Sequence, residues 1–214
     1  MRRFSLTSLC LSAQLAVAGL ALGSDGQGAL GAPVSDPLEF SFALEAQGDL
    51  SGALRSSREA AERSPERYFA RIRVAFLELG LKNYAAAADD YARAAALAPR
   101  ALEALLGRQQ ALLALGRYAE AETAGRQALA RDGDNYLAAS RLAWTLFSLK
   151  RYAEAGKVYA RVVTLYPSDL EMTTGLAYSE LRAGRKREAS DAFRAVLAIL
   201  PSHARAREGL AACR

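Results

Sequence analysis

Apolar side chains recur at helical spacing through most of this sequence. The segment 136–149 shows the pattern, and its apolar residues fall on one face of a helix: Leu142, Ala143, Leu146 and Leu149. Lys150 and Arg151 then form a short polar turn, and a second helix is predicted over 152–166, before Pro167. Two helices joined by a tight turn make a helical hairpin, so the pattern predicts hairpins rather than isolated helices.

The hairpin pattern returns every 34 residues. Residues 116–122 read GRYAEAE, and residues 150–156 read KRYAEAG. Four of the six prolines stand in one column at this period, with Gly133 in the missing slot: Pro65, Pro99, Pro167 and Pro201. Repetition at a fixed period of this length is typical of solenoids, in which each hairpin packs only on its neighbours.

Small residues and helix-start signals fit the same period. One column holds only alanine, which lets the two helices of a hairpin approach closely: Ala53, Ala87, Ala121, Ala155 and Ala189. Asp36 precedes Pro37, and proline is favoured at the first position of a helix. Ser168 precedes the letters DLE, which predicts that Ser168 caps the next helix.

These features resemble the tetratricopeptide repeat family. Gly116, Tyr118, Ala121 and Ala128 carry most of the family pattern, and the next repeat carries it again with Lys150 in place of the glycine. The resemblance implies an all-α, right-handed superhelical solenoid whose first helices line a concave face. It covers five gapless repeats and a short C-terminal capping helix: 34–67, 68–101, 102–135, 136–169, 170–203 and 204–214.

The sequence also departs from the family pattern in two places. The bulky residue expected early in each repeat is lost, since that column reads Pro37, Arg71, Leu105, Ala139 and Thr173. Arg108 and Gln109 stand where apolar and small residues are usual, which predicts loose packing of the third repeat.

The resemblance also implies a partner-binding groove along the first helices. Position 9 of the repeats is mostly aromatic, and position 12 is mostly bulky and apolar, apart from Glu45 in the first repeat. With Arg141 of position 6, the groove residues are expected to be Phe42, Phe76, Leu79, Gln110, Leu113, Arg141, Trp144, Phe147, Tyr178 and Leu181. Aromatic side chains provide large contact areas for a peptide. The alternative is that these rings pack against neighbouring helices and are mostly buried.

The N-terminal residues are typical of a secretory signal peptide. Arg2 and Arg3 precede an apolar run that ends in small residues, which predicts cleavage after about residue 23 and a linker over 24–33. The protein is then expected in the periplasm or cell envelope, without a membrane contact. The alternative is an uncleaved helix that anchors the chain in the inner membrane. Cleavage would lower the net charge from +5 to +3, because it removes two basic residues and no acid.

Charge and composition limit the chemistry of the protein. Positive and negative residues are mixed along the chain, which does not favour nucleic acid as a partner. The chain has one histidine, His203, predicted in a surface turn, and Cys213 is the one cysteine left after cleavage. We therefore expect no catalytic residues, no metal and no cofactor. The Lys, Asn and Arg residues with which some family members grip a peptide C-terminus are also missing.

The expected function is a scaffold without enzymatic activity. Such a protein would bind an apolar or amphipathic partner segment in its groove during assembly or secretion in the envelope. One alternative is a structural repeat protein that forms homo-oligomers through the ends of the solenoid. A further alternative is an accessory subunit of an enzyme.

Overall fold

A computed structural model describes residues 36–214 of the chain. The predicted signal peptide and linker lie outside these residues. Within them the structure contains eleven α-helices and no strand. The helices are α1 (Pro37–Ala46), α2 (Leu50–Arg63), α3 (Tyr68–Gly80), α4 (Tyr84–Leu97), α5 (Leu102–Ala114), α6 (Tyr118–Arg131), α7 (Tyr136–Ser148), α8 (Tyr152–Leu165), α9 (Leu170–Arg182), α10 (Lys186–Ile199) and α11 (Ala204–Ala212).

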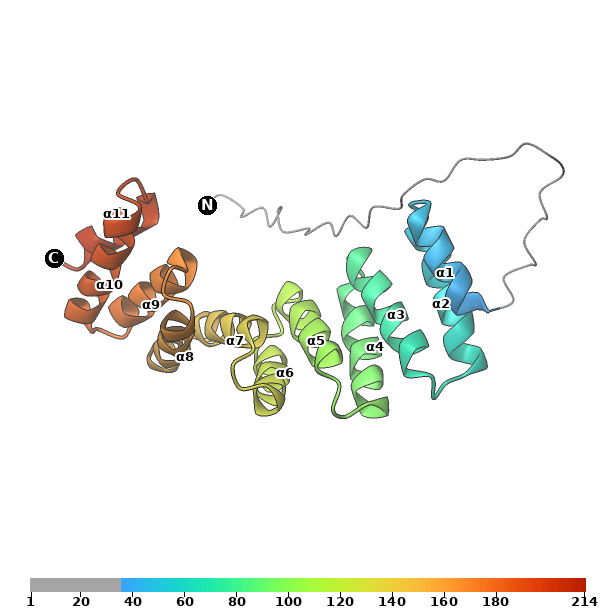
Figure 1. Cartoon of the computed structure of the whole chain (residues 1–214). Helices are drawn as coiled ribbons and strands as arrows, with labels where there is room; N and C mark the ends of the chain where they lie inside the picture. The colour runs from blue at the N-terminus through green and yellow to red at the C-terminus, as the bar shows by residue number, and fades with distance from the viewer. Residues whose placement is uncertain (1–35) are drawn as a thin grey trace, which may run out of the picture. The chain divides into compact units, whose positions relative to one another are not determined.

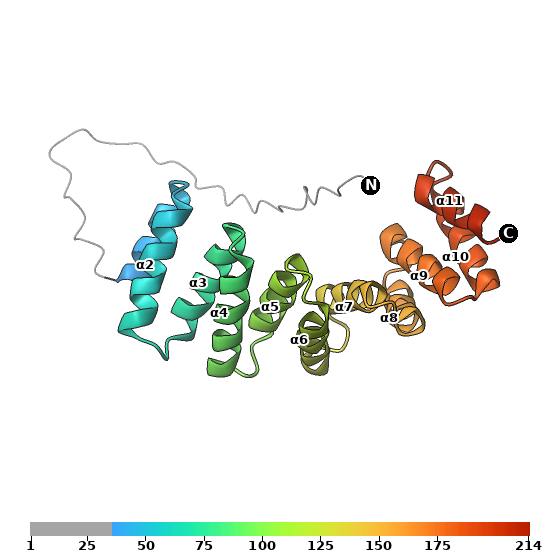
Figure 2. The same cartoon turned by 180° about the vertical axis from the view of Figure 1, so that it is seen from behind.

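The helices form antiparallel hairpins that follow one another in a single row (Figures 1 and 2). From α3 onward, the first helices of successive hairpins begin at a constant spacing of 34 residues, at Tyr68, Leu102, Tyr136, Leu170 and Ala204. Each helix packs mainly on the helices before and after it in the chain. The predicted all-α fold of repeated hairpins with a short last helix is therefore confirmed.

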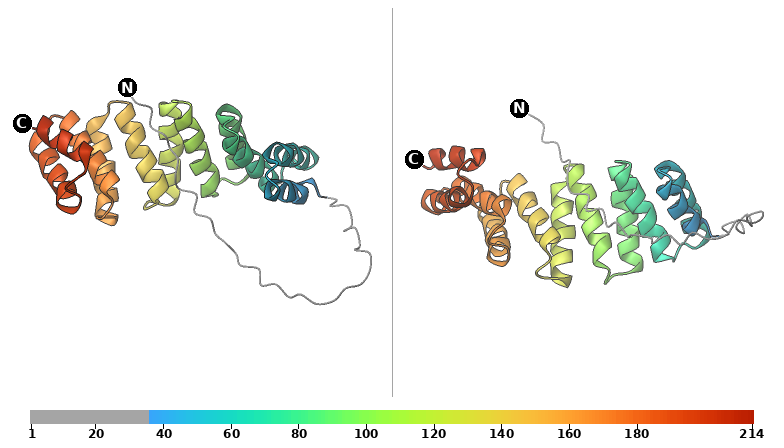
Figure 3. Two further views of the ribbon diagram at one scale, coloured as in Figure 1. Left: turned by 90° about the horizontal axis from the view of Figure 1, so that it is seen from above. Right: turned by 45° about the horizontal axis from the view of Figure 1, so that its top comes forward.

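The odd-numbered helices lie on the inner side of this row. From α3 to α11, each odd-numbered helix contacts the next odd-numbered helix directly, whereas even-numbered helices of residues 36–214 make no comparable contact with each other. Closer spacing on one side of a stack means that the stack curves toward that side. The view from above in Figure 3 shows the same row of hairpins. The odd-numbered helices therefore supply the concave face.

Acidic side chains start several of the helices. Asp36 Oδ1 accepts a hydrogen bond of 2.9 Å from Leu38 N, with Pro37 in the first turn, as predicted. The prediction for α9 was wrong by one residue. Asp169 is its cap and accepts a bond of 3.0 Å from Met172 N. A cap residue must directly precede the first helical residue to reach the free N–H groups, and Ser168 lies one position too early.

Two kinds of packing join successive hairpins. In three junctions an aromatic ring of an even-numbered helix lies on a glycine of the next odd-numbered helix: Tyr91 on Gly107, Tyr159 on Gly175 and Phe193 on Gly209. A Cβ atom at Gly107 would lie 2.2 Å from Tyr91 Cζ, so no larger residue fits without movement. In the other two junctions a small residue takes the place of the ring, and an arginine takes the place of the glycine: Ser57 with Arg73, and Gly125 with Arg141.

The third repeat is closely packed at Gln109, where loose packing was predicted. Gln109 is fully buried, and its Nε2 donates a hydrogen bond of 3.3 Å to the carbonyl oxygen of Ala138. A Cβ atom at Gly125 would lie 2.3 Å from this same Nε2. The amide of Gln109 therefore occupies the space left by the absent aromatic ring. Gly125 across the junction makes room for this polar group. Arg108, the other unusual residue of this repeat, has a buried Nε without a hydrogen-bond partner among residues 36–214.

Candidate partner-binding groove

Three predicted groove aromatics are about half exposed. The exposed fractions are 53% for Phe42 on α1, 52% for Phe76 on α3 and 50% for Trp144 on α7. These rings belong to the inner, odd-numbered helices. Exposed aromatic rings on a concave face provide contact area for a partner at little cost in side-chain entropy. The two interpretations of this column, exposed ladder and buried core, are both partly correct.

Trp144 is held in place by its neighbours. The indole ring stacks on Phe147, with ring centroids 6.0 Å apart and an angle of 12° between the planes. Phe147 in turn packs edge-on against Tyr152 of α8 at 5.2 Å. Phe147 is partly buried against the core formed by α7 and α8. The open face of Trp144 is thus supported from behind, which fixes its orientation.

Arg73 of α3 contacts the residues of α1 at the first end of the groove. Its guanidinium lies 3.8 Å from the centre of the Phe42 ring, and Nη2 forms an ion pair of 2.6 Å with Glu45 Oε2. Nε donates a bond of 3.1 Å to Ser41 Oγ. Arg73 is buried, so these partners replace its hydration. The guanidinium of Arg73 therefore covers part of the Phe42 ring, which leaves less of this ring free for a partner.

Arg141 occupies the middle of the groove. Although it belongs to α7, its guanidinium reaches across to α5, where Nη1 donates 3.0 Å to the carbonyl oxygen of Leu106 and Nη2 donates 2.9 Å to Gln110 Oε1. Burial lowers the pKa of Arg141 below its usual range. Its hydrogen-bond partners are neutral, and no carboxylate of residues 36–214 lies within 4.0 Å of it. Gln110 itself is exposed and orients this guanidinium.

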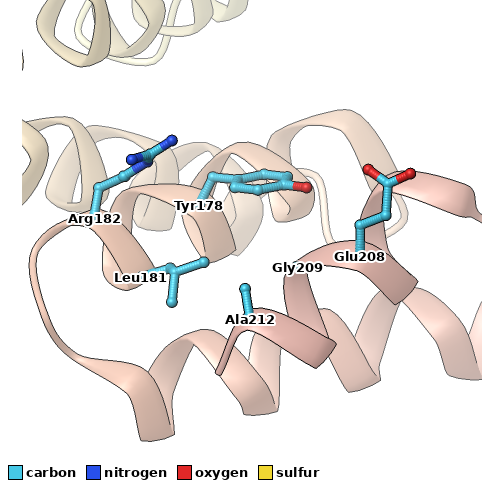
Figure 4. A pocket seen from close by; sticks show the side chains of 6 residues that line it. All are labelled: Tyr178, Leu181, Arg182, Glu208, Gly209 and Ala212. Atoms are coloured by element: carbon cyan, nitrogen blue, oxygen red, sulfur yellow. The ribbon is translucent and has the colours of Figure 1, made fainter. Parts of the chain in front are cut away.

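Tyr178 contributes to a pocket at the end of the groove rather than to an exposed ladder. Its hydroxyl donates 2.8 Å to the carbonyl oxygen of Arg205, and its ring packs edge-on against Phe193 at 5.0 Å. Burial raises the pKa of Tyr178. The pocket holds about 420 Å³, with Arg182 and Glu208 on opposite sides of the tyrosine ring (Figure 4). Leu181 and Ala212 form its apolar part.

The position 12 residues are less exposed than the position 9 rings. Leu79 and Leu113 are partly buried against the core of α3 to α6, and Leu181 against the core of α9 to α11. The sequence prediction also missed three exposed apolar residues of the inner helices, Phe40 on α1 and two that share one column. Phe69 is 71% exposed and Leu137 is 46% exposed, each one residue after the start of its helix. The column at position 2 of the repeats carries both and would have indicated them.

The described part of the chain contains little else that is reactive. No group of three or more metal-binding side chains occurs within it, and none of its helices is long and apolar enough to cross a membrane. His203 is a helix cap rather than a surface residue. Its Nδ1 accepts 3.2 Å from Ala206 N at the start of α11, and its side chain is 12% exposed. The free N–H groups of α11 explain this position, because Nδ1 can accept one of them.

Comparison with known proteins supports the same fold. A family model described as tetratricopeptide repeat matches residues 73–135, 106–169 and 174–214, which together are more than half of the chain. The crystal structure of MamA protein is 16% identical, covers 75% of this chain and 88% of that one, and has a TM-score of 0.72. The crystal structure of YrrB, described as a TPR protein with an unusual peptide-binding site, is 16% identical, covers 80% of this chain and 89% of that one, and has a TM-score of 0.73.

A tetratricopeptide repeat protein from Parabacteroides merdae is 18% identical, covers 83% of this chain and 70% of that one, and has a TM-score of 0.72. No curated protein matches the sequence. At these identities the likeness to solved structures establishes the fold alone.

Proposed function

Because the chain belongs to the tetratricopeptide repeat family, a family of protein interaction scaffolds that are generally not enzymes, we propose that it binds an apolar or amphipathic segment of a partner protein in its inner groove. One observation supports this proposal above the others. Phe76 and Trp144 are half exposed on the inner helices, although aromatic rings of this size are usually covered in a free protein.

The chemistry of the groove favours a peptide over other ligands. Its surface combines exposed aromatic rings with the guanidinium groups of Arg73 and Arg141, of which Arg73 is already paired with Glu45. A nucleic acid would require a row of unpaired basic side chains instead. The single tryptophan of the chain lies at its centre. A half-exposed tryptophan is a typical anchor for a partner side chain, because its burial removes a large apolar area from water.

A peptide library tests this proposal. We expect selection of random dodecapeptides on the full chain to enrich apolar sequences, and acrylamide quenching of Trp144 to decrease when such a peptide binds. Trp144→Ala should weaken binding by more than about 1 kcal/mol while helical circular dichroism is unchanged. Leu97→Ala is a matched control, because Leu97 is 40% exposed but lies on the even-numbered helix α4. Equal binding by both variants would refute the groove as the binding site.

Export to the cell envelope is part of the proposal. It rests on the order of Arg2, Arg3, the apolar run and the small residues near position 23. Mass spectrometry of the protein from its native envelope fraction should find a chain that begins near Ser24. A protein that begins at Met1 and sediments with the inner membrane would contradict cleavage and favour an anchor.

Self-assembly through the end of the stack is a second candidate function. Phe40 on α1 is 44% exposed, whereas Val74, the residue 34 positions later, is 1% exposed because α2 covers it. Within the described residues no hairpin precedes α1 to cover Phe40 in the same way. If a second copy covers it, light scattering should detect an oligomer that Phe40→Glu dissociates. A monomer at every concentration would exclude this candidate.

A further inference from the structure

From α3 to α9 the groove chemistry alternates between successive repeats, and α1 carries two further exposed rings beside α3. All six large apolar residues exposed on the inner helices belong to α1, α3 or α7: Phe40, Phe42, Phe69, Phe76, Leu137 and Trp144. The pairs Phe69 with Leu137 and Phe76 with Trp144 are each separated by 68 residues. Residues seven apart in one helix share a face, so α3 and α7 each present one apolar subsite built in the same way.

The helices between and beside these subsites differ from them in a regular way. α5 and α9 carry Glu103 and Glu171 where α3 and α7 carry Phe69 and Leu137. They also carry Gly107 and Gly175 at the positions of Arg73 and Arg141, and these glycines are covered by aromatic rings from the preceding helices. The same junction packing that places an arginine on α3 and α7 thus gives these two helices a different groove surface from α5 and α9.

The two arginines are not equivalent in charge. Arg73 is neutralised by Glu45 at 2.6 Å. Arg141 lies over α5, between the two subsites, and is held by the neutral oxygens of Leu106 and Gln110. A partly buried guanidinium without a carboxylate is an incomplete ion pair, because its desolvation is not repaid by an opposite charge. A carboxylate supplied by the partner would complete it.

The distance between the two apolar subsites favours a partner segment in an extended conformation. Packed helices are about 8–10 Å apart, so α3 and α7 are separated by two such spacings, roughly 16–20 Å. An extended chain rises about 3.3 Å per residue and turns alternate side chains to the same side. Side chains six residues apart in an extended segment are therefore about 20 Å apart and point in the same direction.

From these observations we infer that the groove binds an extended segment with two bulky apolar side chains six residues apart and carboxylates between them. This inference rests on the proposed function and specifies its partner. Each apolar side chain occupies one subsite, on Phe76 or on Trp144, and a carboxylate between them binds Arg141. Two linked anchors bind more tightly than one, because the second anchor binds within the complex formed by the first.

Short synthetic peptides with blocked ends test the inference by calorimetry on the full chain. The reference peptide is SFSESESFS, and three controls change one feature each. SFSESESSS lacks the second anchor, SFSESSESFS shifts it to the opposite side of the strand, and SFSQSQSFS lacks the charges. We expect the reference peptide to bind at least tenfold more tightly than the first two controls. Phe76→Ala should abolish this preference, as should Trp144→Ala.

Arg141→Gln tests the charge separately. It should weaken binding of the glutamate peptide about tenfold more than binding of the glutamine peptide, and an unchanged helical circular dichroism spectrum shows that the variant still folds. If all four peptides bind equally and Trp144→Ala weakens all of them, the inference is wrong while the proposed groove function stands. If no peptide binds at millimolar concentration, the inference is wrong, and the selection of random peptides on the same chain decides the proposed function separately.

Discussion

The contact between Tyr91 and Gly107 gives a quantitative test of how the hairpins are joined. A Cβ atom added at Gly107 would lie 2.2 Å from Tyr91 Cζ and 2.3 Å from Cε1. Carbon atoms in contact are ordinarily about 3.5–4.0 Å apart, so the ring or the helix would have to move by more than about 1 Å. Tyr91 is 4% exposed, so its ring has no open space to move into.

Two effects of Gly107→Ala oppose each other. Alanine is favoured over glycine within a helix by about 1 kcal/mol. Overpacking in a closed core costs about 1–3 kcal/mol. We therefore expect Gly107→Ala to lower the free energy of unfolding by up to about 2 kcal/mol. Gly80→Ala is the control, because nothing lies within 4 Å of the added Cβ atom there, and it should raise this free energy by up to about 1 kcal/mol.

Urea unfolding followed by circular dichroism measures both variants. Midpoints are compared where the slope is unchanged, since repeat proteins can unfold in more than one step. In the background of Tyr91→Ala the clash is absent, so Gly107→Ala should become stabilising, with a coupling energy of about 1–3 kcal/mol. If Gly107→Ala stabilises the intact chain as much as Gly80→Ala does, the ring does not enclose the glycine and the reasoning fails.

Three further predictions concern the hairpins and their caps. Ala155→Leu should lower stability by about 1–3 kcal/mol, because this residue is 0% exposed between two helices. Arg126→Ala should cost at most about 1 kcal/mol, because it removes only the ion pairs of a half-exposed guanidinium with Glu122 and Glu154. Equal melting temperatures would refute the assigned packing. Asp169→Ala should lower stability by about 1–3 kcal/mol, since it removes both the cap of α9 and the acceptor of a 2.7 Å bond from Tyr136 Oη, and Asp169→Asn should cost less. Burial, together with Asp169, raises the pKa of Tyr136 to about 12. The contribution of the Tyr136 hydroxyl to the free energy of unfolding is therefore complete below pH 10 and is lost as the pH rises to about 12. Urea titrations should show that this free energy decreases less over the same pH range in Tyr136→Phe than in the unchanged protein.

Both the sequence and the structure were needed to identify the exposed residues of the inner face. The position 9 column indicated Phe76 and Trp144, and the structure placed them on the inner helices with half of each ring exposed. Tyr178 stands in the same column but is fixed by Phe193 and Arg205. A column of equal residue types does not determine exposure, because exposure depends on what the neighbouring repeat places beside each ring.

The sequence alone determined the fold of this protein. A period of 34 residues with proline, tyrosine and alanine in fixed columns is sufficient for a stack of helical hairpins, because each hairpin repeats the same local contacts. Only the tertiary structure decided how the junctions are filled. At the junction of α6 and α7, Gly125 stands in place of the aromatic ring and Arg141 in place of the glycine, on two different hairpins. The guanidinium of Arg141 therefore lies on α5, where Leu106 and Gln110 accept its hydrogen bonds. Such contacts depend on which side chains meet across a junction, and the order of residues within one repeat does not contain that information.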